Sequence, residues 1–122
     1  MTKIEELTPR SRGLDMTVRV VEKLDEREVT VRSSGRQHRV AEFLIGDETG
    51  TIILSLWDDA IDQVELDKTY ALKNVYVNTF RNSMRVNTGK YGSMESSEET
   101  VEANTENNVS EKFVEAPPRR NF

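Results

Sequence analysis

The sequence predicts an all-β protein, built as a small Greek-key barrel with one short helix. Several short segments alternate apolar and polar residues with period two, and turns that contain glycine separate them. Five or six such strands suit a barrel better than a sandwich, which requires more strands. A length of 122 residues allows one domain of this kind and little more.

The first strands lie near the N-terminus. Residues 15–22 alternate with period two, and residues 28–32 do so again before a turn at Ser33, Ser34 and Gly35. The pattern predicts either two short strands or one long strand interrupted by a loop.

A hairpin between residues 39–45 and 51–57 is the clearest local prediction. Its loop spans residues 46–50, where glycines at both ends permit positive φ and Asp47 can cap the backbone. The two glycines and the aspartate together favour a tight connection.

The rest of the domain returns to strands after one helical interlude. Residues 58–64 fit one or two turns of helix, and residues 68–77 and 83–87 have strand patterns. Residues 89–92 are expected to end the ordered part. The folded domain is therefore expected to span residues 1–95.

Residues 96–122 are expected to form a disordered acidic tail. The segment holds seven apolar residues among 27, no glycine, and many Ser, Glu, Asn and Thr residues. Such a composition buries too little apolar surface to offset the entropy of ordering the chain.

The net charge of −5 is unfavourable for a nucleic-acid binder, since phosphate binding requires local positive potential. Residues 1–95 carry a net charge of −2 and residues 96–122 carry −3, so most of the excess acid lies in the short tail. The domain itself therefore remains compatible with a nucleic-acid partner.

Other classes of site find little support. The chain has no cysteine, which excludes disulfides, a cysteine-based zinc site and a thiol nucleophile. The single histidine, His38, lacks companions for a metal site, the acidic pairs at 47–48 and 58–59 lie at turns, and there is no phosphate-binding glycine loop. We therefore expect a protein that is not an enzyme and needs no cofactor or metal.

No apolar run exceeds three residues and the N-terminus is polar, so a cytoplasmic location without membrane contact is expected.

The single tryptophan is predicted to lie on the outer surface. Ile52, Leu54 and Leu56 form the core face of their strand, so Trp57 points the other way. Its companions on that partly polar face are Thr51, Ile53 and Ser55. The alternative is that Trp57 covers the edge of the core.

Aromatic and cationic residues also alternate between residues 73 and 85. Tyr76 and Phe80 are interleaved with Lys73 and Arg81, and Arg85 lies on the polar side of its strand. Single-strand binders use this combination, because bases stack on flat rings while cations follow the phosphates. Tyr76 fits the core equally well, whereas Phe80 follows a polar turn and is expected to be exposed.

Five motifs occur together in the chain: Glu42-Phe43-Leu44-Ile45-Gly46-Asp47-Glu48-Thr49-Gly50, Leu56-Trp57-Asp58, Asn74-Val75-Tyr76, Phe80, and Val86-Asn87-Thr88-Gly89. In these motifs the chain resembles a known family, the single-OB-fold single-stranded DNA-binding proteins of archaea. Similar proteins include the DNA-binding subunit of the sensor-of-single-stranded-DNA complex and, more distantly, the OB domains of replication protein A. The resemblance covers about residues 5–93.

The resemblance implies a five-stranded OB-fold barrel and a DNA-binding site. Three aromatic residues of the family stack bases, and they correspond to Trp57, Tyr76 and Phe80. The first hairpin of the family also contributes contacts, near Arg27 and Val29. From the facing argument we add the cations Lys73, Arg81, Arg85 and Lys90.

The implied function is to bind and protect single-stranded DNA with little sequence preference during replication, recombination and repair. Two alternatives remain open, an RNA-binding OB domain and an OB-fold scaffold that binds only protein. The tail ends in Phe122 after Pro117, Pro118 and two arginines, and it is a candidate for docking replication or repair proteins. Deleting residues 96–122 is expected to leave DNA affinity unchanged or slightly improved, because the deletion removes negative charge.

Overall fold

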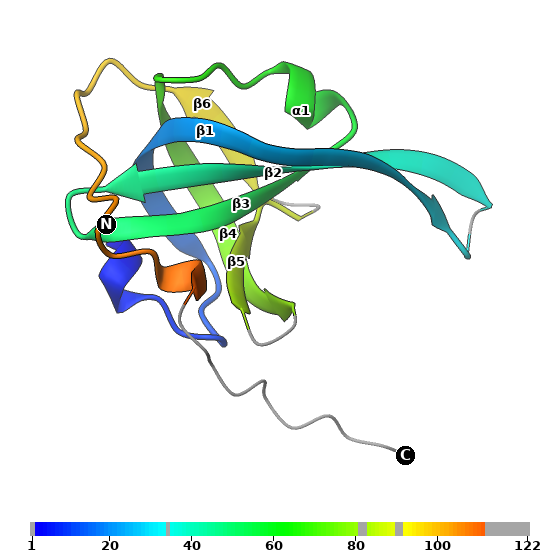
Figure 1. Cartoon of the computed structure of the whole chain (residues 1–122), viewed down its shortest axis with the longest axis horizontal. Helices are drawn as coiled ribbons and strands as arrows, with labels where there is room; N and C mark the ends of the chain where they lie inside the picture. Colours follow the sequence, from blue (N-terminus) through cyan, green and yellow to red (C-terminus); the bar gives the residue numbers. More distant parts are fainter. Residues whose placement is uncertain (1, 34, 81–82, 90–91, 112–122) are drawn as a thin grey trace.

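The computed structural model describes residues 2–33, 35–80, 83–89 and 92–111, which form a six-stranded barrel-like sheet with one short α-helix (Figure 1). The strand order is β1-β2-β3-β5-β4-β6, and β1 also pairs with β4, which closes the ring. The predicted all-β barrel is confirmed, with β6 as an additional strand. The elements are η1 (Ile4–Glu6), β1 (Leu14–Val31), β2 (Arg36–Asp47), β3 (Gly50–Trp57), α1 (Asp59–Asp62), β4 (Thr69–Phe80), β5 (Ser83–Asn87), β6 (Ser93–Ser96) and η2 (Val109–Glu111).

None of the helices in the described ranges is long and apolar enough to span a membrane.

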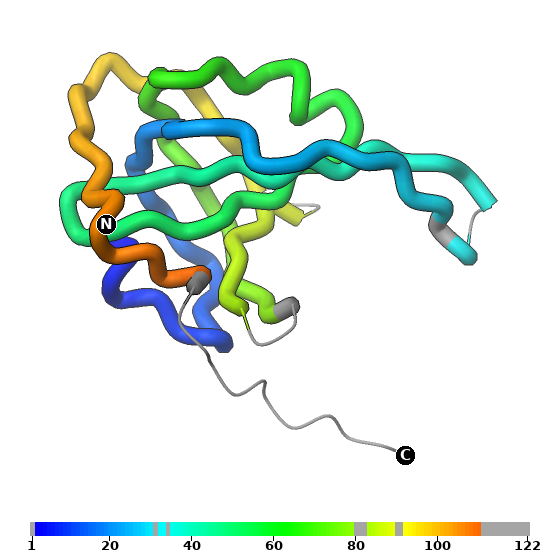
Figure 2. The backbone as a smooth tube through the Cα atoms, in the orientation of Figure 1, coloured from blue at the N-terminus to red at the C-terminus, as the bar shows by residue number. Residues whose placement is uncertain are grey.

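The N-terminal strand segments form one continuous strand, β1, which serves two neighbours. Its first part pairs with β4 and its longer remainder pairs with β2. The register shifts between Val20 and Glu22 and again between Lys23 and Asp25. Such bulges bend a strand and increase its twist, which allows β1 to leave the barrel wall. The distal parts of β1 and β2 then project beyond the barrel as a two-stranded ribbon (Figures 1 and 2).

The hydrophobic core lies inside the ring of strands. Ile52, Leu54 and Leu56 of β3 are fully buried in it, as the alternation predicted. On β2 the core residues are Ala41, Phe43 and Ile45, so the side chains between them point outward.

The β2–β3 hairpin is capped by Asp47, as predicted. Its carboxylate accepts the backbone N–H of Thr49 at 2.8 Å and that of Ile4 at 3.0 Å. The expectation about the glycines is wrong, because neither Gly46 nor Gly50 adopts a positive φ. They instead allow close approach of Ala103 and Asn107, which lie in a later segment.

The described part of the tail expected at residues 96–122 packs on the barrel. A Cβ on Gly46 would lie 2.6 Å from Cβ of Ala103, and one on Gly50 would lie 2.7 Å from the carbonyl oxygen of Asn107. Val109 is buried in the core cluster. Disorder is therefore not found for residues 97–111, and residues 112–122 lie outside the described part.

Composition did not reveal this packing because polar side chains provide much of it. Ser110 Oγ accepts the N–H of Ile53 at 2.8 Å and donates to the carbonyl oxygen of Met84 at 2.5 Å. One serine therefore joins β3 to β5 beside their short parallel ladder, which covers residues 53–55 and 85–87. Hydrogen bonds of this kind satisfy backbone groups that the strands leave unpaired.

Candidate nucleic-acid interface

A continuous row of outward-facing residues crosses the barrel wall. Glu42 of β2 pairs with Ser55 of β3, Ser55 pairs with Asn87 of β5, and Asn87 pairs with Tyr76 of β4. We call this row, together with the flanking Trp57, Arg85, Asn78 and Arg27, the outer face. It includes the β2–β3 surface on which OB folds bind oligonucleotides.

Trp57 lies on the outer face at the end of β3, as predicted. Its side chain is 44% exposed, and its backbone pairs with Val40 of β2. An exposed indole in this position offers a flat surface on which a base could stack.

The backbone directly after Trp57 is held by Asp58, which has a positive φ of 51°. The Asp58 carboxylate accepts the N–H of Arg39 at 3.0 Å, and its other oxygen lies 2.7 Å from His38 Nδ1. These two contacts, with His38 the stronger, hold the pKa of Asp58 below its ordinary value. His38, for which the sequence indicated no metal site, therefore helps to fix the chain beside Trp57.

The remaining outward residues of β3 are less accessible than predicted. Thr51 is fully buried, Ser55 is nearly so, and Ile53 is half-buried. The cause at Thr51 is the tail, since its N–H donates to the carbonyl oxygen of Asn107 and its backbone bridges to Asn108. The exposed part of β3 is therefore concentrated at its Trp57 end.

Tyr76 also faces outward, which resolves the ambiguity of its position. Val75 and Val77 on either side are buried in the core, while Tyr76 is 37% exposed. One side of its ring packs on Gly89, where a Cβ would lie 2.7 Å from Tyr76 Cε1. Gly89, which has a φ of +62°, therefore supports the ring and leaves part of it open.

Three predicted site residues cannot be placed in the same detail. The backbone of Phe80 ends β4 opposite Ser83, but its side chain lies outside the described part. Arg81 and Lys90 both lie outside the described residues. Their proposed contacts with DNA stay predictions.

Lys73 and Val29 are placed at a distance from the middle of the outer face. Lys73 is exposed in the part of β4 that pairs with β6, whereas Arg85 pairs with the other half of β4. Val29 is half-buried on the projecting part of β1, where it pairs with His38. The structure therefore places Lys73 away from Arg85.

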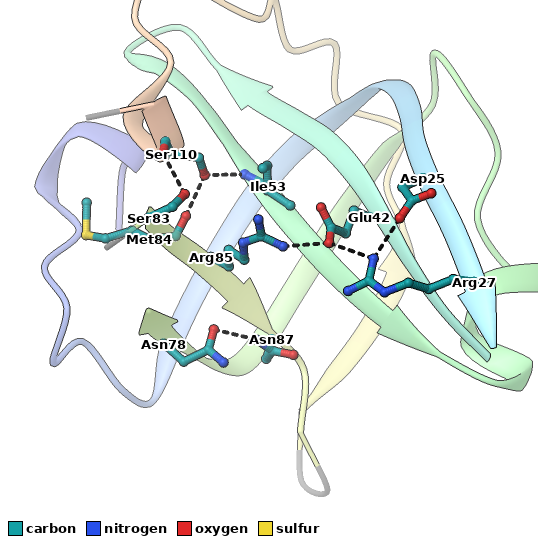
Figure 3. Close-up of polar contacts among 10 residues, drawn as sticks. All are labelled: Asp25, Arg27, Glu42, Ile53, Asn78, Ser83, Met84, Arg85, Asn87 and Ser110. Atoms are coloured by element: carbon teal, nitrogen blue, oxygen red, sulfur yellow. Dashed lines mark hydrogen bonds and ion pairs between the residues drawn. The ribbon is translucent and has the colours of Figure 1, made fainter. Parts of the chain in front are cut away.

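Arg85 and Arg27 both form ion pairs with one carboxylate, that of Glu42 (Figure 3). Nη1 of Arg85 lies 2.6 Å from Glu42 Oε1, and Nη1 of Arg27 lies 3.2 Å from the same oxygen. Arg27 also lies 2.7 Å from Asp25, and these two carboxylates, with Asp25 the stronger, raise the pKa of Arg27. Both arginines are therefore held by carboxylates of the protein itself.

Sequence reasoning missed Glu42 and the amide pair of Asn78 and Asn87. Asn87 Nδ2 donates to Asn78 Oδ1 at 2.7 Å, next to Arg85 in the row (Figure 3). The alternation that buries Ala41 and Phe43 would have placed Glu42 outward.

Within the ranges that the structure covers, no group of three or more His, Cys, Asp or Glu residues is arranged to hold a metal ion.

Comparisons of sequence match the chain to a family and to two relatives. The model of a family described as single-stranded DNA binding protein Ssb-like, OB fold, matches residues 7–96. An uncharacterized protein of Arabidopsis thaliana is 32% identical over 101 residues, which cover 76% of this chain and 66% of the relative. The single-stranded DNA binding protein Ssb of Saccharolobus solfataricus is 28% identical over 87 residues, which cover 71% of this chain and 57% of the relative. The chain thus matches less than two thirds of the length of either relative.

Comparisons of structure agree with this result. The solution structure of a hypothetical protein from Arabidopsis thaliana has a TM-score of 0.78 at 29% identity, covering 98% of this chain and 89% of the other. A replication protein A heterotrimer bound to single-stranded DNA gives a TM-score of 0.69 at 18% identity, covering 86% of this chain and 27% of the other, which supports the fold alone. With the ring-like strand order and the match over residues 7–96, the chain belongs to the Ssb-like OB-fold family of single-stranded DNA-binding proteins.

Proposed function

We propose that the protein binds single-stranded DNA on the outer face, with bases stacked on Trp57 and Tyr76. The observation that carries this proposal is the 44% exposed Trp57 at the end of β3, on the surface that OB folds use for oligonucleotides. Stacking of one base on an aromatic side chain contributes about 1–3 kcal/mol and requires little sequence preference.

We also propose DNA contacts for the predicted site residues that lie outside the described part. Phe80 would add a third stacking surface beyond Tyr76, and Arg81 and Lys90 would follow the phosphates. Lys73 and Arg27 would contact the strand where it leaves the middle of the face. The family of the chain supports this arrangement, and mutation of each residue tests it.

The biological role follows from this binding mode. Coating of single-stranded DNA with little sequence preference would protect it during replication, recombination and repair. We propose a binding protein without catalytic activity in the cytoplasm, and replication or repair proteins as partners of the C-terminal residues. The name of the Saccharolobus relative, a single-stranded DNA binding protein, supports the DNA-binding part of this role.

The test is a titration of tryptophan fluorescence with an oligothymidine of about 20 nucleotides. The chain has one tryptophan, so the signal reports on one position. We expect strong quenching by the single strand, weak quenching by a duplex of the same length, and an affinity that falls as salt rises. Absence of both quenching and a gel shift would overturn the proposal and favour a protein-binding scaffold. A matched RNA oligomer that binds more tightly would instead assign the face to RNA.

A further inference from the structure

A carboxylate lies within a surface that is proposed to bind a polyanion. Glu42 lies on β2 opposite Ser55, with Trp57 two residues further along β3. Its side chain is only 12% exposed, because Arg85 approaches from β5 and Arg27 from β1 (Figure 3). The part of the outer face around Glu42 is therefore an ordered charge network.

The charges in this network balance one another. Arg27 and Arg85 supply two positive charges, and Glu42 and Asp25 supply two negative charges. The Arg85 side chain is 16% exposed, so solvent and salt screen its contact with Glu42 less than they screen a surface ion pair. A phosphate that approached Arg85 would have to compete with a carboxylate that is already 2.6 Å away.

Bases interact differently from phosphates with the Glu42 carboxylate. A base carries no net charge, and its amino and imino groups donate hydrogen bonds to carboxylates. A single strand can turn its bases toward the protein, whereas a duplex presents its phosphates to any surface that does not enter a groove. A carboxylate on the face therefore penalises the duplex more than the single strand.

We propose that Glu42 is a specificity-determining residue, which excludes phosphates from its part of the outer face and so favours single strands over duplexes. The inference rests on the proposed DNA-binding function and names a new role for a residue of that site. Arg85, held by Glu42, then acts as part of the surface under the bases and contributes little as a phosphate clamp.

The experiment compares the unmodified protein with Glu42→Gln in the full chain. Dissociation constants are measured for a 20-nucleotide single strand and a 20-base-pair duplex at several salt concentrations. We expect Glu42→Gln to bind the duplex several-fold more tightly, so that the ratio of single-strand to duplex affinity falls by about threefold or more. The duplex salt dependence should steepen, by about 0.9 in log–log slope for each phosphate gained.

Two matched variants separate a local effect from one of net charge. Glu48→Gln removes the same charge at the β2–β3 turn, where Glu48 pairs with Lys3, and it should leave the ratio unchanged. Glu42→Asp keeps the charge and should keep most of the discrimination. An equal change in the ratio for Glu48→Gln, or an unchanged ratio for Glu42→Gln, overturns the inference.

A thermal unfolding curve of each variant shows whether it is folded. If Glu42→Gln does not fold, Arg85→Gln is used in its place. This substitution removes the positive charge that pairs with Glu42, so the Glu42 carboxylate should repel phosphates more strongly. The ratio should rise in that variant, and a ratio that falls or stays unchanged would contradict the proposal. Failure of the unmodified protein to bind single strands is a separate outcome, which rejects the proposed function itself.

Discussion

The two ends of β3 obey the same alternation but differ in their exposure. At the Trp57 end the outward side chain is 44% exposed, whereas Thr51 at the hairpin end is fully buried although it also faces outward. The difference arises because residues 103–110 pack against the hairpin end, through contacts with Gly46, Gly50 and Thr51. The direction of a side chain is thus a local property, while its accessibility depends on what packs over it.

The largest effect is expected from removing the tail residues that cover the hairpin end of β3. A chain truncated after residue 96 loses the buried Val109 and the Ser110 bridge between β3 and β5. Burial of a valine contributes roughly 1.5–3 kcal/mol and each hydrogen bond about 1 kcal/mol, so we expect a loss of about 3–5 kcal/mol in the free energy of unfolding. Chemical denaturation measures this loss.

A truncation after residue 111 is the control, because it keeps every contact described for the tail. It should unfold with the midpoint of the full chain, and equal midpoints for the two truncations would show that residues 97–111 contribute nothing. The sequence alone predicted that deletion of residues 96–122 leaves DNA affinity unchanged or slightly improved. With the tail packed on the barrel, we expect that result only for deletion of residues 112–122. Truncation after residue 96 should lower the apparent affinity through unfolding.

The exposed end is tested by Trp57→Ala. We expect single-strand affinity to fall by about 1–3 kcal/mol, while stability changes little because the indole is far from fully buried. A gel shift or anisotropy titration measures the affinity, since the variant has no tryptophan signal. Leu66→Ala removes another exposed apolar side chain, 53% exposed, and should bind like the unmodified protein. Equal affinities for the two variants would remove Trp57 from the site.

The smallest effect concerns the contacts that fix the chain beside Trp57. His38 and the Arg39 N–H lower the pKa of Asp58, so the ionised carboxylate stabilises the folded state above the ordinary aspartate pKa of about 4. This contribution is lost as pH falls through the lowered pKa. Asp58→Asn should therefore have a lower Tm than the unmodified protein at pH 7, and the difference should shrink below pH 4.

Asp59→Asn is the matched control, since it removes the same charge from the next residue and leaves the contact with His38 intact. Its Tm should follow that of the unmodified protein across the pH range. A Tm difference for Asp58→Asn that persists unchanged at low pH would show that ionisation of Asp58 is not its source.

Sequence reasoning succeeded where the physical cause is local. The hairpin, its Asp47 cap and the outward direction of Trp57 all follow from residues a few positions apart. It failed where distant segments meet. Ser110 and Ile53 are 57 positions apart, and Glu42 is joined to strands on both sides of it by Arg27 and Arg85.

By itself the sequence determined the barrel class, the alternation of each strand and the residues that face outward. The pleat of a strand sets these properties, because successive side chains point to opposite sides whatever surrounds them. Only the tertiary structure decided which outward residues stay exposed and which cations are paired with carboxylates. Those properties depend on packing and on charge pairs between segments far apart in the chain, and at the outer face they leave Trp57 open, cover Thr51 and neutralise Arg85 with Glu42.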